Sequence, residues 1–560
     1  MQTAERTSIP LNNSPARFYL PALAVLCALA FFYGLGSLPF LGPDEPRYAQ
    51  VAREMYASGD WITPRLAGLH WFEKPALTYW LAALGYTLFG VSEFAARAGV
   101  ALLASGGVFL LYWFGRRVHS PQFGYLSAAA LATCGLWVGF ARGATFDLPL
   151  SVCLEAALLC FFLWERQAGQ ADDSDVWWWL FCLALGGAVL AKGLLGIVLP
   201  AAIIGLYLLL TRRLLIVLQP RLLFFGALLF LAAAALWYGP MLWRHGREFI
   251  DEFFIAHHFQ RYTSNKFKHP QPFYFFFEMV LAGSLPWTPF WLLNLGQTWR
   301  ERHGLLNDEA QRLRLFLWLW VLVPLVFFSF SGSKLPGYIL PVFPALALLV
   351  GQQLLPLFAS QARSKALYLV PVLFALVAVA AYVAGWRELG LSLFAIRLIA
   401  GLAVVLALVQ LVLLWRGMTA ATVMFVPLAV VIMIALTVEQ LAPALGRIES
   451  LAALSLQASQ AAQPGERLIF YINPHHSVDF YAPALPLRDE HAELITAMSL
   501  RALDEQVRQY GSLLVLTPQR WSHDILESTT LTVERLGQNT GEPRCTPGCD
   551  WLLLRARPKH

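Results

Sequence analysis

The sequence predicts an all-α polytopic membrane protein of about thirteen transmembrane helices, followed by a small C-terminal α/β domain. Hydrophobic residues make up 58% of the 560-residue chain and charged residues only 14%, a balance that excludes an ordinary soluble protein. Apolar runs recur between positions 18 and 440, and the composition becomes more polar after position 440. We therefore expect a transmembrane domain over residues 1–440 and a soluble domain over residues 441–560.

Each expected span is an apolar run of about 20 residues, or fewer where the helix is buried in protein. The run at 75–89 is expected to be a re-entrant or surface helix, because counting it as a span would break the alternation of loop charges. The first apolar run has no small-residue cleavage site, so we expect it to remain as a span. The expected spans are residues 18–40, 94–114, 121–140, 148–164, 177–191, 193–211, 221–243, 275–296, 313–331, 337–357, 366–385, 394–415 and 420–440.

Loop charge predicts the orientation of these spans. The net charge of +6 lies mostly in short loops, so it indicates orientation within membrane lipids and not a nucleic-acid partner. By the positive-inside rule, the basic loops at 115–117, 211–213, 299–304, 362–365 and 415–417 are expected on the cytoplasmic side, together with the N-terminus. Alternation then places on the outer side the segments 41–93 (the first outer loop), 141–147, 191–193, 244–274, 332–337, 386–393 and the tail.

The tail combines signals of strands and of a helix. ERLIFYI (466–472), SLLVLT (512–517) and WLLLRA (551–556) are expected to be strands, and Ala492–Tyr510 has helical spacing. The pair His475 and His476 has no second cluster of ligand residues near it in the sequence. We therefore expect these two histidines to be ordinary surface or loop residues.

The cysteines fall into two groups. Cys545 and Cys549 lie four apart in the polar segment CTPGC, where a disulfide is expected if the tail lies in an oxidising compartment; two free thiols are the alternative. The other five lie within apolar runs, where we expect them to serve in packing. These are Cys27, Cys134, Cys153, Cys160 and Cys182.

The first outer loop opens with a dense cluster of ionisable and aromatic residues between Leu41 and Pro75. Pro46 suits a first helical turn, so a short surface helix is expected over Arg47–Ala57, with Asp44 or Glu45 near its N-cap. A loop that only joins two spans does not require so many charges of both signs. We interpret the cluster as part of a reaction site at the membrane surface.

The other outer loops add further charged groups, and the predicted topology places all of them on one membrane face. Convergence of carboxylates and cations at one depth of a bilayer is typical of a functional site. For Asp147 a helix N-cap is the alternative role, and for Lys334 a solvated loop lysine. The candidates are Asp44, Glu45, Arg47, Glu73, Lys74, Arg142, Asp147, Lys192, His257, His258, Arg261, Lys334 and Tyr338.

The balance of these groups suggests a substrate class. Lys74, Arg261 and Lys334 suit phosphate groups, while Asp44 and Asp147 suit acid–base work or pairing with a cation. Spacing alone makes Glu73, His257 and His258 only weak candidates for a metal site. The aromatics Trp61, Trp71, Trp243 and Trp287 suit sugar or lipid surfaces, and equally suit the interfacial belt of a membrane protein. A lipid phosphate that carries a sugar meets all of these needs.

The motifs GPDEPRYA, WFEKPALTYWL, ARGATFDLP and SGSKLPGYILP resemble those of the bacterial aminoarabinose transferases. These are relatives of the protein O-mannosyltransferases in the GT-C class of membrane glycosyltransferases. The resemblance implies transfer of 4-amino-4-deoxy-L-arabinose from undecaprenyl phosphate to lipid A phosphate at the periplasmic face of the inner membrane. The implied consequence is resistance to polymyxin and other cationic peptides.

The resemblance also implies roles for individual residues. Asp44 and Asp147 match the catalytic acids of the first and second outer loops. We expect substrate binding by Glu45, Arg47, Glu73, Lys74, Lys192, Arg261, Lys334 and Tyr338.

The expected reaction inverts the anomeric carbon and requires no cofactor, and a divalent metal is left open. The alternative enzyme uses a polyprenyl-phosphate sugar to glycosylate a protein or another lipid. The alternative from another class is a lipid or sugar transporter, which would have ionisable residues near the bilayer midplane and an inverted repeat. The sequence shows no clear repeat, and its polar residues gather at the ends of the spans.

Overall fold

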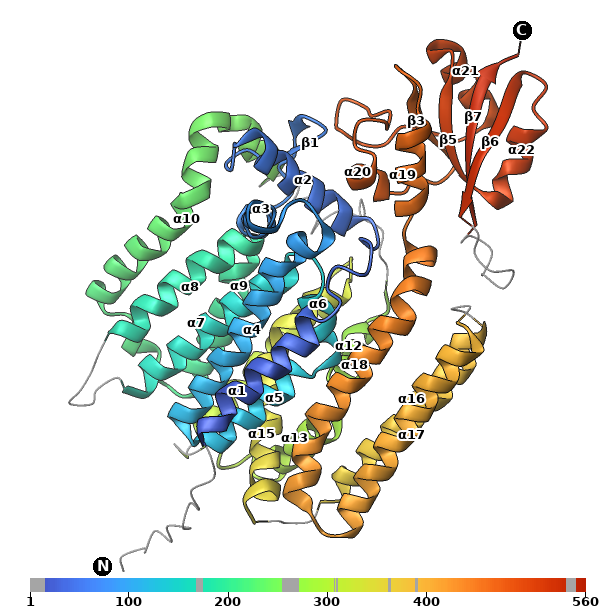
Figure 1. The fold of residues 1–560 in the computed structure, drawn as a ribbon. Helices are drawn as coiled ribbons and strands as arrows, with labels where there is room; N and C mark the ends of the chain where they lie inside the picture. The colour runs from blue at the N-terminus through green and yellow to red at the C-terminus, as the bar shows by residue number, and fades with distance from the viewer. Residues whose placement is uncertain are drawn as a thin grey trace, which may run out of the picture.

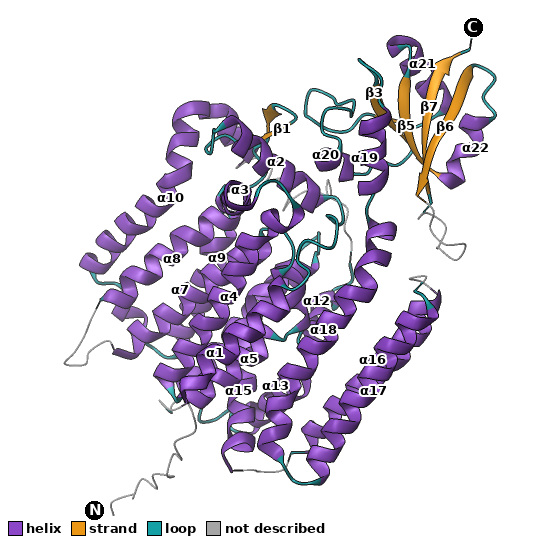
Figure 2. Ribbon diagram, viewed as in Figure 1, coloured by secondary structure: helices purple, strands orange, loops and turns teal. Residues whose placement is uncertain are grey.

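The computed structural model describes residues 16–167, 175–253, 271–306, 308, 311–360, 364–387, 391–539 and 550–559. Its helices lie side by side in a bundle, and a small sheet domain lies beyond one end of that bundle (Figure 1). Apart from a short hairpin, the strands are confined to this small domain (Figure 2). The expected all-α polytopic fold with a C-terminal α/β domain is confirmed.

Every run that was expected to cross the membrane contains helix within the described residues. Eight helices are long and apolar enough to cross a bilayer, or nine if the pair α5 and α6, bent by 66°, is one broken span. Three expected spans correspond to shorter apolar helices, at Arg17–Phe32, Val176–Lys192 and Leu195–Leu210. The expected single span 275–296 is instead divided into two short helices, α12 (Phe275–Gly283) and α13 (Thr288–Arg300). A multi-pass membrane protein is therefore what the described residues form.

The bundle helices have the following bounds, in chain order: α1 (Ala16–Cys27), a π-helix (Ala28–Phe32), α4 (Glu93–Val118), α5 (Pro121–Ala132), α6 (Gly135–Ala141), α7 (Asp147–Gln167), α8 (Val176–Lys192), α9 (Leu195–Leu210), η2 (Leu214–Val217), α10 (Pro220–Phe249), α12 (Phe275–Gly283), α13 (Thr288–Arg300), α14 (Arg312–Ser329), η5 (Pro336–Val342), α15 (Phe343–Ser360), η6 (Lys365–Tyr368), α16 (Leu369–Arg387), α17 (Leu393–Trp415) and α18 (Thr419–Glu449). Because α18 continues past position 440, the helical part of the chain extends beyond the expected domain boundary.

The first outer loop folds into two helices joined by a small hairpin. These are α2 (Asp44–Ser58) and α3 (Leu77–Phe89), with β1 (Arg65–Leu66) and β2 (Leu69–His70) between them. The surface helix thus begins earlier than expected, and its N-cap is Pro43, which makes no side-chain capping bond. Asp44 and Glu45 instead lie in its first turn, where carboxylates favour the positive end of the helix dipole.

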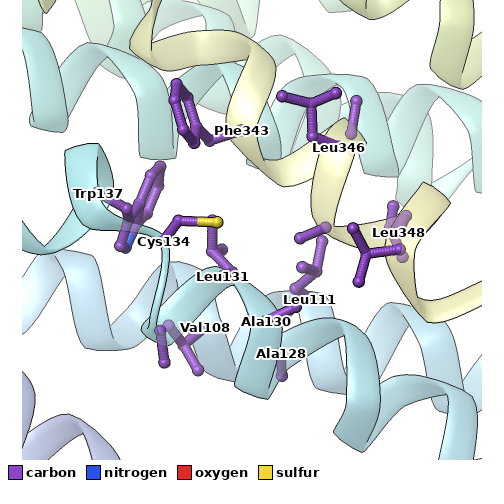
Figure 3. Close-up of a cluster of buried hydrophobic side chains, with 14 of the residues drawn as sticks. Val108, Leu111, Ala128, Ala130, Leu131, Cys134, Trp137, Phe343, Leu346 and Leu348 are labelled. Atoms are coloured by element: carbon purple, nitrogen blue, oxygen red, sulfur yellow. The ribbon is translucent and has the colours of Figure 1, made fainter. Parts of the chain in front are cut away.

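Small residues allow close packing in the bundle. A Cβ atom added to Gly115 of α4 would lie only 2.6 Å from the Cα of Gly124 in α5. Van der Waals packing of this kind drives helix association where the surrounding lipid is as apolar as the side chains. Figure 3 shows part of this core, in which the labelled side chains are Val108, Leu111, Ala128, Ala130, Leu131, Cys134, Trp137, Phe343, Leu346 and Leu348.

Two sequence expectations concern the interior of the bundle. The five cysteines of the apolar runs are free, and all except Cys153 are buried, as packing residues would be. Trp287 does not belong to an interfacial belt: it is only 1% exposed, and its Nε1 donates to Thr133 Oγ1 at 2.9 Å. That hydrogen bond gives its polar edge a partner inside the protein. Trp243, by contrast, is 87% exposed.

The C-terminal domain contains a five-stranded mixed sheet with the strand order β4-β3-β5-β7-β6. β3 runs parallel to β4 and β5, whereas β7 runs antiparallel to β5 and β6. The three expected strands are confirmed as β3 (Arg467–Tyr471), β5 (Leu513–Pro518) and β7 (Trp551–Pro558). The domain also contains three short helices and the strand β6 (Leu531–Asn539). The helices are α19 (Ala452–Ala461), α20 (Ser477–Tyr481) and α22 (Ser522–Leu526).

One expectation about this domain is wrong, and another falls on residues that are not described. The helix expected over Ala492–Tyr510 is only α21 (Leu500–Tyr510), and the short strand β4 (Thr496–Ala497) precedes it. Ser499 begins α21, because its side chain accepts a hydrogen bond from the Ala502 N–H as an N-cap. The CTPGC segment at 545–549 lies outside the described residues.

The C-terminal domain contacts the first outer loop through α20. Tyr481 Oη donates to Glu93 Oε1 at 2.7 Å and accepts from the Phe40 N–H at 3.0 Å. Arg53 of α2 donates to the Phe480 carbonyl at 3.1 Å, with its guanidinium over the Phe480 ring. The soluble domain and the first outer loop therefore lie at the same end of the bundle (Figure 1).

The two tail histidines precede α20 and serve its packing. His476 Nδ1 lies 2.9 Å from an oxygen of the buried Asp479, and the His475 ring packs edge-on against Trp551. Burial, together with the neighbouring His476, lowers the pKa of His475 to about 4. His475 therefore stays neutral in the folded domain at a pH where the same side chain is charged in the unfolded chain.

This pKa predicts a loss of stability in mild acid. Between about pH 6.5 and pH 4 the unfolded chain binds a proton at His475 that the folded chain does not, so stability falls as pH falls through this window. We expect the unfolding midpoint of the full chain in detergent to drop more between pH 7 and pH 5 than that of His475→Asn. The control is His491→Asn, because His491 is exposed; an equal drop in the wild type and His475→Asn would contradict the prediction.

Candidate functional site

A cavity of about 640 Å³ lies between the first outer loop, the start of α7, the end of α8 and the turn after α14. Six of the residues expected to form a site line it: Asp44, Glu73, Lys74, Asp147, Lys192 and Tyr338. These positions are separated by up to about 290 residues of sequence, so the fold brings them together as the predicted topology requires. Four other polar side chains, Tyr48, Thr145, Ser331 and Ser333, also line the cavity.

Asp147 and Lys192 form one charged pair in the cavity wall. The Lys192 ammonium at the end of α8 donates to the Asp147 carboxylate at the start of α7. The same ammonium lies 4.6 Å from the centre of the Tyr338 ring, a distance suited to a cation–π contact. Lys192 is thus held between a carboxylate and an aromatic face, which explains why a lysine is tolerated between two apolar runs.

A glycine lets η5 approach this pair. A Cβ atom added to Gly337 would lie 2.5 Å from the Asp147 side chain and 2.7 Å from the Phe140 ring. Any other residue would have to displace the Asp147 carboxylate and the Phe140 ring or push η5 away from α7. The Pro-Gly-Tyr sequence of the SGSKLPGY motif therefore places Tyr338 against Lys192 through the absence of a side chain at position 337.

A second group of charges comes from the first outer loop. Lys74 Nζ lies 2.8 Å from Glu73 Oε1, and Arg47 Nη2 lies 2.7 Å from Asp44 Oδ1. Burial alone would lower the pKa of Arg47, but the attraction of Glu73 and Asp44 outweighs burial and raises that pKa. Burial and the same two carboxylates raise the pKa of Tyr48 well above its ordinary value. Arg47 is thus charged and Tyr48 neutral beside the cavity.

Lys334 lies in the turn between α14 and η5 and is not a solvated loop lysine. Its side chain is 7% exposed, and its ammonium donates to the Ser331 carbonyl at 2.6 Å. Ser333 and Leu335, on either side of it, line the cavity. The turn places a buried cation next to the cavity wall, which favours the anion-binding interpretation over the solvated one.

Glu45 has a different environment from its neighbour Asp44. It forms a two-pronged ion pair with Arg97 of α4, at 2.7 and 2.9 Å, and both side chains are almost fully buried. Its two oxygens also accept the N–H groups of Leu41 at 3.1 Å and Ala144 at 2.9 Å. Glu45 therefore joins the first outer loop, α4 and the 141–147 loop, and it does not line the cavity.

The rest of the cavity wall is apolar, with a smaller cavity beside it. The smaller one, of about 400 Å³, shares Phe140 and Thr145 with the main cavity and is lined by glycines of α6, α12 and the 141–147 loop. A cavity lined by both charged and apolar side chains suits a ligand with a charged head and a hydrocarbon tail. The apolar residues of the main cavity are Pro75, Phe140, Phe146, Leu194, Leu195, Val198, Phe327, Phe328, Leu335 and Pro336.

Three expected site residues cannot be placed. Arg261, His257 and His258 lie outside the described residues, so their relation to the cavity and the weak metal site with Glu73 both stay predictions. Within the described part of the chain, one group of side chains could hold a metal ion: His70, His245 and Glu248. The sequence analysis missed this group because its members lie about 175 residues apart.

Sequence reasoning also missed the serines and the arginine that complete this region. Ser331 and Ser333 belong to the SGSKLPGY motif that also contains Lys334, so the motif could have identified these two serines as candidates. Arg97 lies inside an apolar run, and a charged residue in such a run requires a partner. That rule flags Arg97 but does not identify Glu45, because the pairing depends on how the first outer loop folds.

Comparisons with known proteins identify relatives of this chain. Residues 73–238 match the family described as dolichyl-phosphate-mannose-protein mannosyltransferase. The chain is 32% identical over 369 residues to the undecaprenyl phosphate-alpha-4-amino-4-deoxy-L-arabinose arabinosyl transferase of Erwinia tasmaniensis, a match covering 65% of this chain and 65% of that protein. The protein of the same name from Aeromonas salmonicida is 33% identical over 332 residues, which cover 59% of this chain and 58% of that protein. Each match thus spans less than two thirds of the relative.

Solved structures extend the likeness over nearly the whole chain. ArnT from Cupriavidus metallidurans in the apo state has a TM-score of 0.78 and 25% identity, with 97% of this chain and 98% of that chain covered. The crystal structure of the same protein bound to undecaprenyl phosphate has a TM-score of 0.77 and 24% identity, with 96% and 98% covered. The resemblance predicted from the motifs is confirmed, and the fold is the GT-C fold of ArnT.

The Glu45–Arg97 pair yields a test of its structural role. Replacing Arg97 by Met leaves a buried carboxylate without its cation, so we expect Arg97→Met to lower the free energy of unfolding by about 3 to 5 kcal/mol. The double variant Glu45→Gln/Arg97→Met should recover part of this loss. The measurement is the thermal unfolding midpoint of the purified chain in detergent.

The matched control is Arg501→Met, which removes the exposed ion pair of Arg501 with Glu505 on α21. Exposed pairs contribute only about 0 to 1 kcal/mol, so this variant should unfold close to the wild type. An Arg97→Met protein that is as stable as Arg501→Met would contradict the assignment of Glu45 to the scaffold.

Proposed function

We propose that this chain is a membrane glycosyltransferase that moves 4-amino-4-deoxy-L-arabinose from undecaprenyl phosphate to a phosphate of lipid A. The observation that carries the proposal is the single cavity in which Asp44, Glu73, Lys74, Asp147 and Lys192 meet beside an apolar wall. The likeness to the arabinosyl transferases supplies the identity of the sugar and of the two lipids. The proposed location is the bacterial inner membrane, with the cavity and the C-terminal domain on the periplasmic side.

The donor phosphate requires cations near the bond that breaks. Lys74 and Lys334 are the proposed cations within the described residues, and Arg261 is proposed with them. Lys74 lines the cavity, and Lys334 lies in the chain between the lining residues Ser333 and Leu335, with its ammonium on the carbonyl of a third lining residue, Ser331. Cations held in place before the reaction stabilise the charge that develops on the departing phosphate. The apolar wall supports binding of the first part of the polyprenyl chain.

The acceptor is also a phosphate, which is largely ionised at neutral pH because its second pKa is about 6. One of its oxygens attacks the anomeric carbon as the bond from that carbon to the donor phosphate breaks, and the donor phosphate leaves with the electron pair. An ionised acceptor requires no general base. We therefore assign Asp44 and Asp147 to orienting the acceptor or pairing with the 4-ammonium group of the sugar. In-line displacement of this kind inverts the anomeric carbon.

The remaining expected residues receive proposed roles that follow their contacts. Glu73 and Arg47 position Lys74 and Asp44 through their ion pairs, and Lys192 with Tyr338 positions Asp147. Glu45 holds the scaffold instead of contacting substrate. The reaction as proposed uses no cofactor. A comparison of activity with and without a chelator tests whether a divalent metal takes part.

One other enzyme function has an observation in its favour. The description of the family matched by residues 73–238 names a protein as the acceptor of the sugar. Transfer to a protein hydroxyl or to another lipid is therefore the second candidate. A hydroxyl acceptor would need a general base, and Asp44 would then be the proposed base. A transporter is less well supported, because the charged residues of the cavity lie at the ends of helices near the outer loops.

The test is mass spectrometry of lipid A from cells that produce the wild-type chain or a variant. The wild type should add an aminopentose to lipid A phosphate, and Asp44→Asn should abolish that addition because an amide cannot pair with the ammonium group. The control is Glu505→Gln, a carboxylate-to-amide change on the exposed face of α21, which should leave the addition intact. Unmodified lipid A in wild-type cells, or modified lipid A with Asp44→Asn, would overturn the proposal.

A further inference from the structure

A cluster of two histidines and a glutamate lies at the junction of the first outer loop with α10. His70 ends the strand β2, while His245 and Glu248 lie near the end of α10. One ligand atom from each of the three side chains lies within 4.8 Å of the other two. None of the three lines the cavity described above, so the cluster is a separate feature of the molecule.

The backbone holds these residues together from two directions. His245 and Glu248 are three residues apart near the end of α10. Gly246 breaks the helix between them, with φ 51° and ψ −119°, a conformation that suits glycine. From the other side, the β1–β2 hairpin pairs Arg65 with His70 and turns through Gly68 at φ 82°. The hairpin thereby presents His70 to α10.

The side chains are also oriented by hydrogen bonds. His70 Nδ1 lies 2.7 Å from Glu248 Oε1, and His245 Nε2 lies 2.9 Å from the hydroxyl of the buried Thr63. The two imidazole rings pack edge to face, with centroids 4.7 Å apart. Thr63 is thus a partner outside the three candidate ligands, and a hydrogen bond to one nitrogen of a ligand histidine is the usual way in which a protein fixes the ring for metal binding.

We propose that His70, His245 and Glu248 bind a divalent transition-metal ion, for which zinc is the best match. Zinc takes imidazole nitrogens and carboxylate oxygens at about 2.0 to 2.2 Å, and sites with three protein ligands complete the shell with water. A tetrahedral shell places ligand atoms about 3.3 to 3.6 Å apart, so ligand atoms that lie up to 4.8 Å apart need to approach by at most about 1.5 Å. All three are half-buried or exposed, which leaves them free to make that adjustment.

The charges around the cluster are compatible with a cation. Arg65 and Arg244 lie nearby, but Asp60 pairs with both of them, at 3.0 and 2.8 Å. Burial alone would raise the pKa of Asp60, but these hydrogen bonds, with two from backbone N–H groups, outweigh burial and lower that pKa. Asp60 therefore keeps its negative charge and offsets part of the charge of the two arginines. Glu248 adds a carboxylate of its own, and the two histidines bind a metal as neutral imidazoles.

The metal would fasten the hairpin to α10. Further contacts join the segment just before the hairpin to α10, since Trp237 Nε1 donates to the Ile62 carbonyl at 2.8 Å and Arg244 pairs with Asp60. His70 precedes Glu73 and Lys74 by three and four residues, so a metal at His70 would stiffen the chain that carries two cavity residues. Metal binding at this cluster does not depend on the proposed transfer reaction.

The test uses the full-length protein in detergent, stripped of metal with a chelator and then incubated with zinc chloride. After desalting, bound zinc is measured by mass spectrometry, and the unfolding midpoint is measured with and without zinc. We expect the wild type to retain a tightly bound zinc ion and to unfold at a higher temperature with zinc, because a ligand that binds only the folded state stabilises it. Loss of one zinc equivalent and of this rise in His70→Ala and His245→Ala would support the site.

Two controls show whether zinc binds at this cluster or elsewhere on the chain. His523→Ala removes a histidine that pairs with a glutamate on the exposed α22, at 3.0 Å, and it should leave zinc binding unchanged. Glu73→Gln removes the other metal candidate and should also retain the zinc ion of the cluster. Glu248→Gln keeps a hydrogen-bonding side chain, so this variant should unfold like the wild type in chelator while losing most of the rise with zinc. If the wild type binds no zinc, or if zinc binding survives His70→Ala and His245→Ala, the proposal is overturned. His70 and Glu248 would then be a hydrogen-bonded pair without a metal.

Discussion

The candidate site depends on one buried ion pair, between Glu45 and Arg97. The pair joins the start of α2 to α4, and through the Ala144 N–H it also fixes the loop that leads into α7. Arg97 further donates to the carbonyls of Leu35 and Pro39, which end the first span. Two outer loops and two spans are thereby fixed at one point. Asp44 directly precedes Glu45, and Asp147 lies three residues after Ala144, so the network fixes the backbone beside both aspartates.

The cavity itself contains charges that are already paired. Glu73 pairs with Lys74, and Asp147 with Lys192, at one end of an apolar bundle. Pairing allows these groups to lie where solvation is poor, and it fixes their geometry before a substrate arrives. In the proposed reaction, a phosphate would exchange with Glu73 as the partner of Lys74. The cost of assembling the charges is then met by folding, and binding only exchanges one anion for another.

The sequence was sufficient for most of the bundle, for three strands of the small sheet and for six of the residues that line the cavity. Long apolar runs, the GPDEPRYA, FEKP and SGSKLPGY motifs, and loop charge are local signals, and the long helices, α2 and the candidate residues of the cavity follow from them. What the sequence did not yield depends on long-range contacts. Glu45 looks like Asp44 in sequence, but the approach of Arg97 makes it a scaffold residue. The group of His70, His245 and Glu248 arises because a hairpin meets a kinked helix, and the helix expected from Ala492 is shortened by the pairing of β4 with β3.

The central claim is that cations from distant loops bind a lipid phosphate in one cavity. Its most direct test is the equilibrium affinity of the purified chain for undecaprenyl phosphate in detergent. The account predicts that Lys74→Ala and Lys334→Ala each raise the dissociation constant at least about tenfold, since each removes a charged hydrogen bond to phosphate. Lys365→Ala, at an exposed position in η6, should bind like the wild type. Equal affinity in all four proteins would contradict the account.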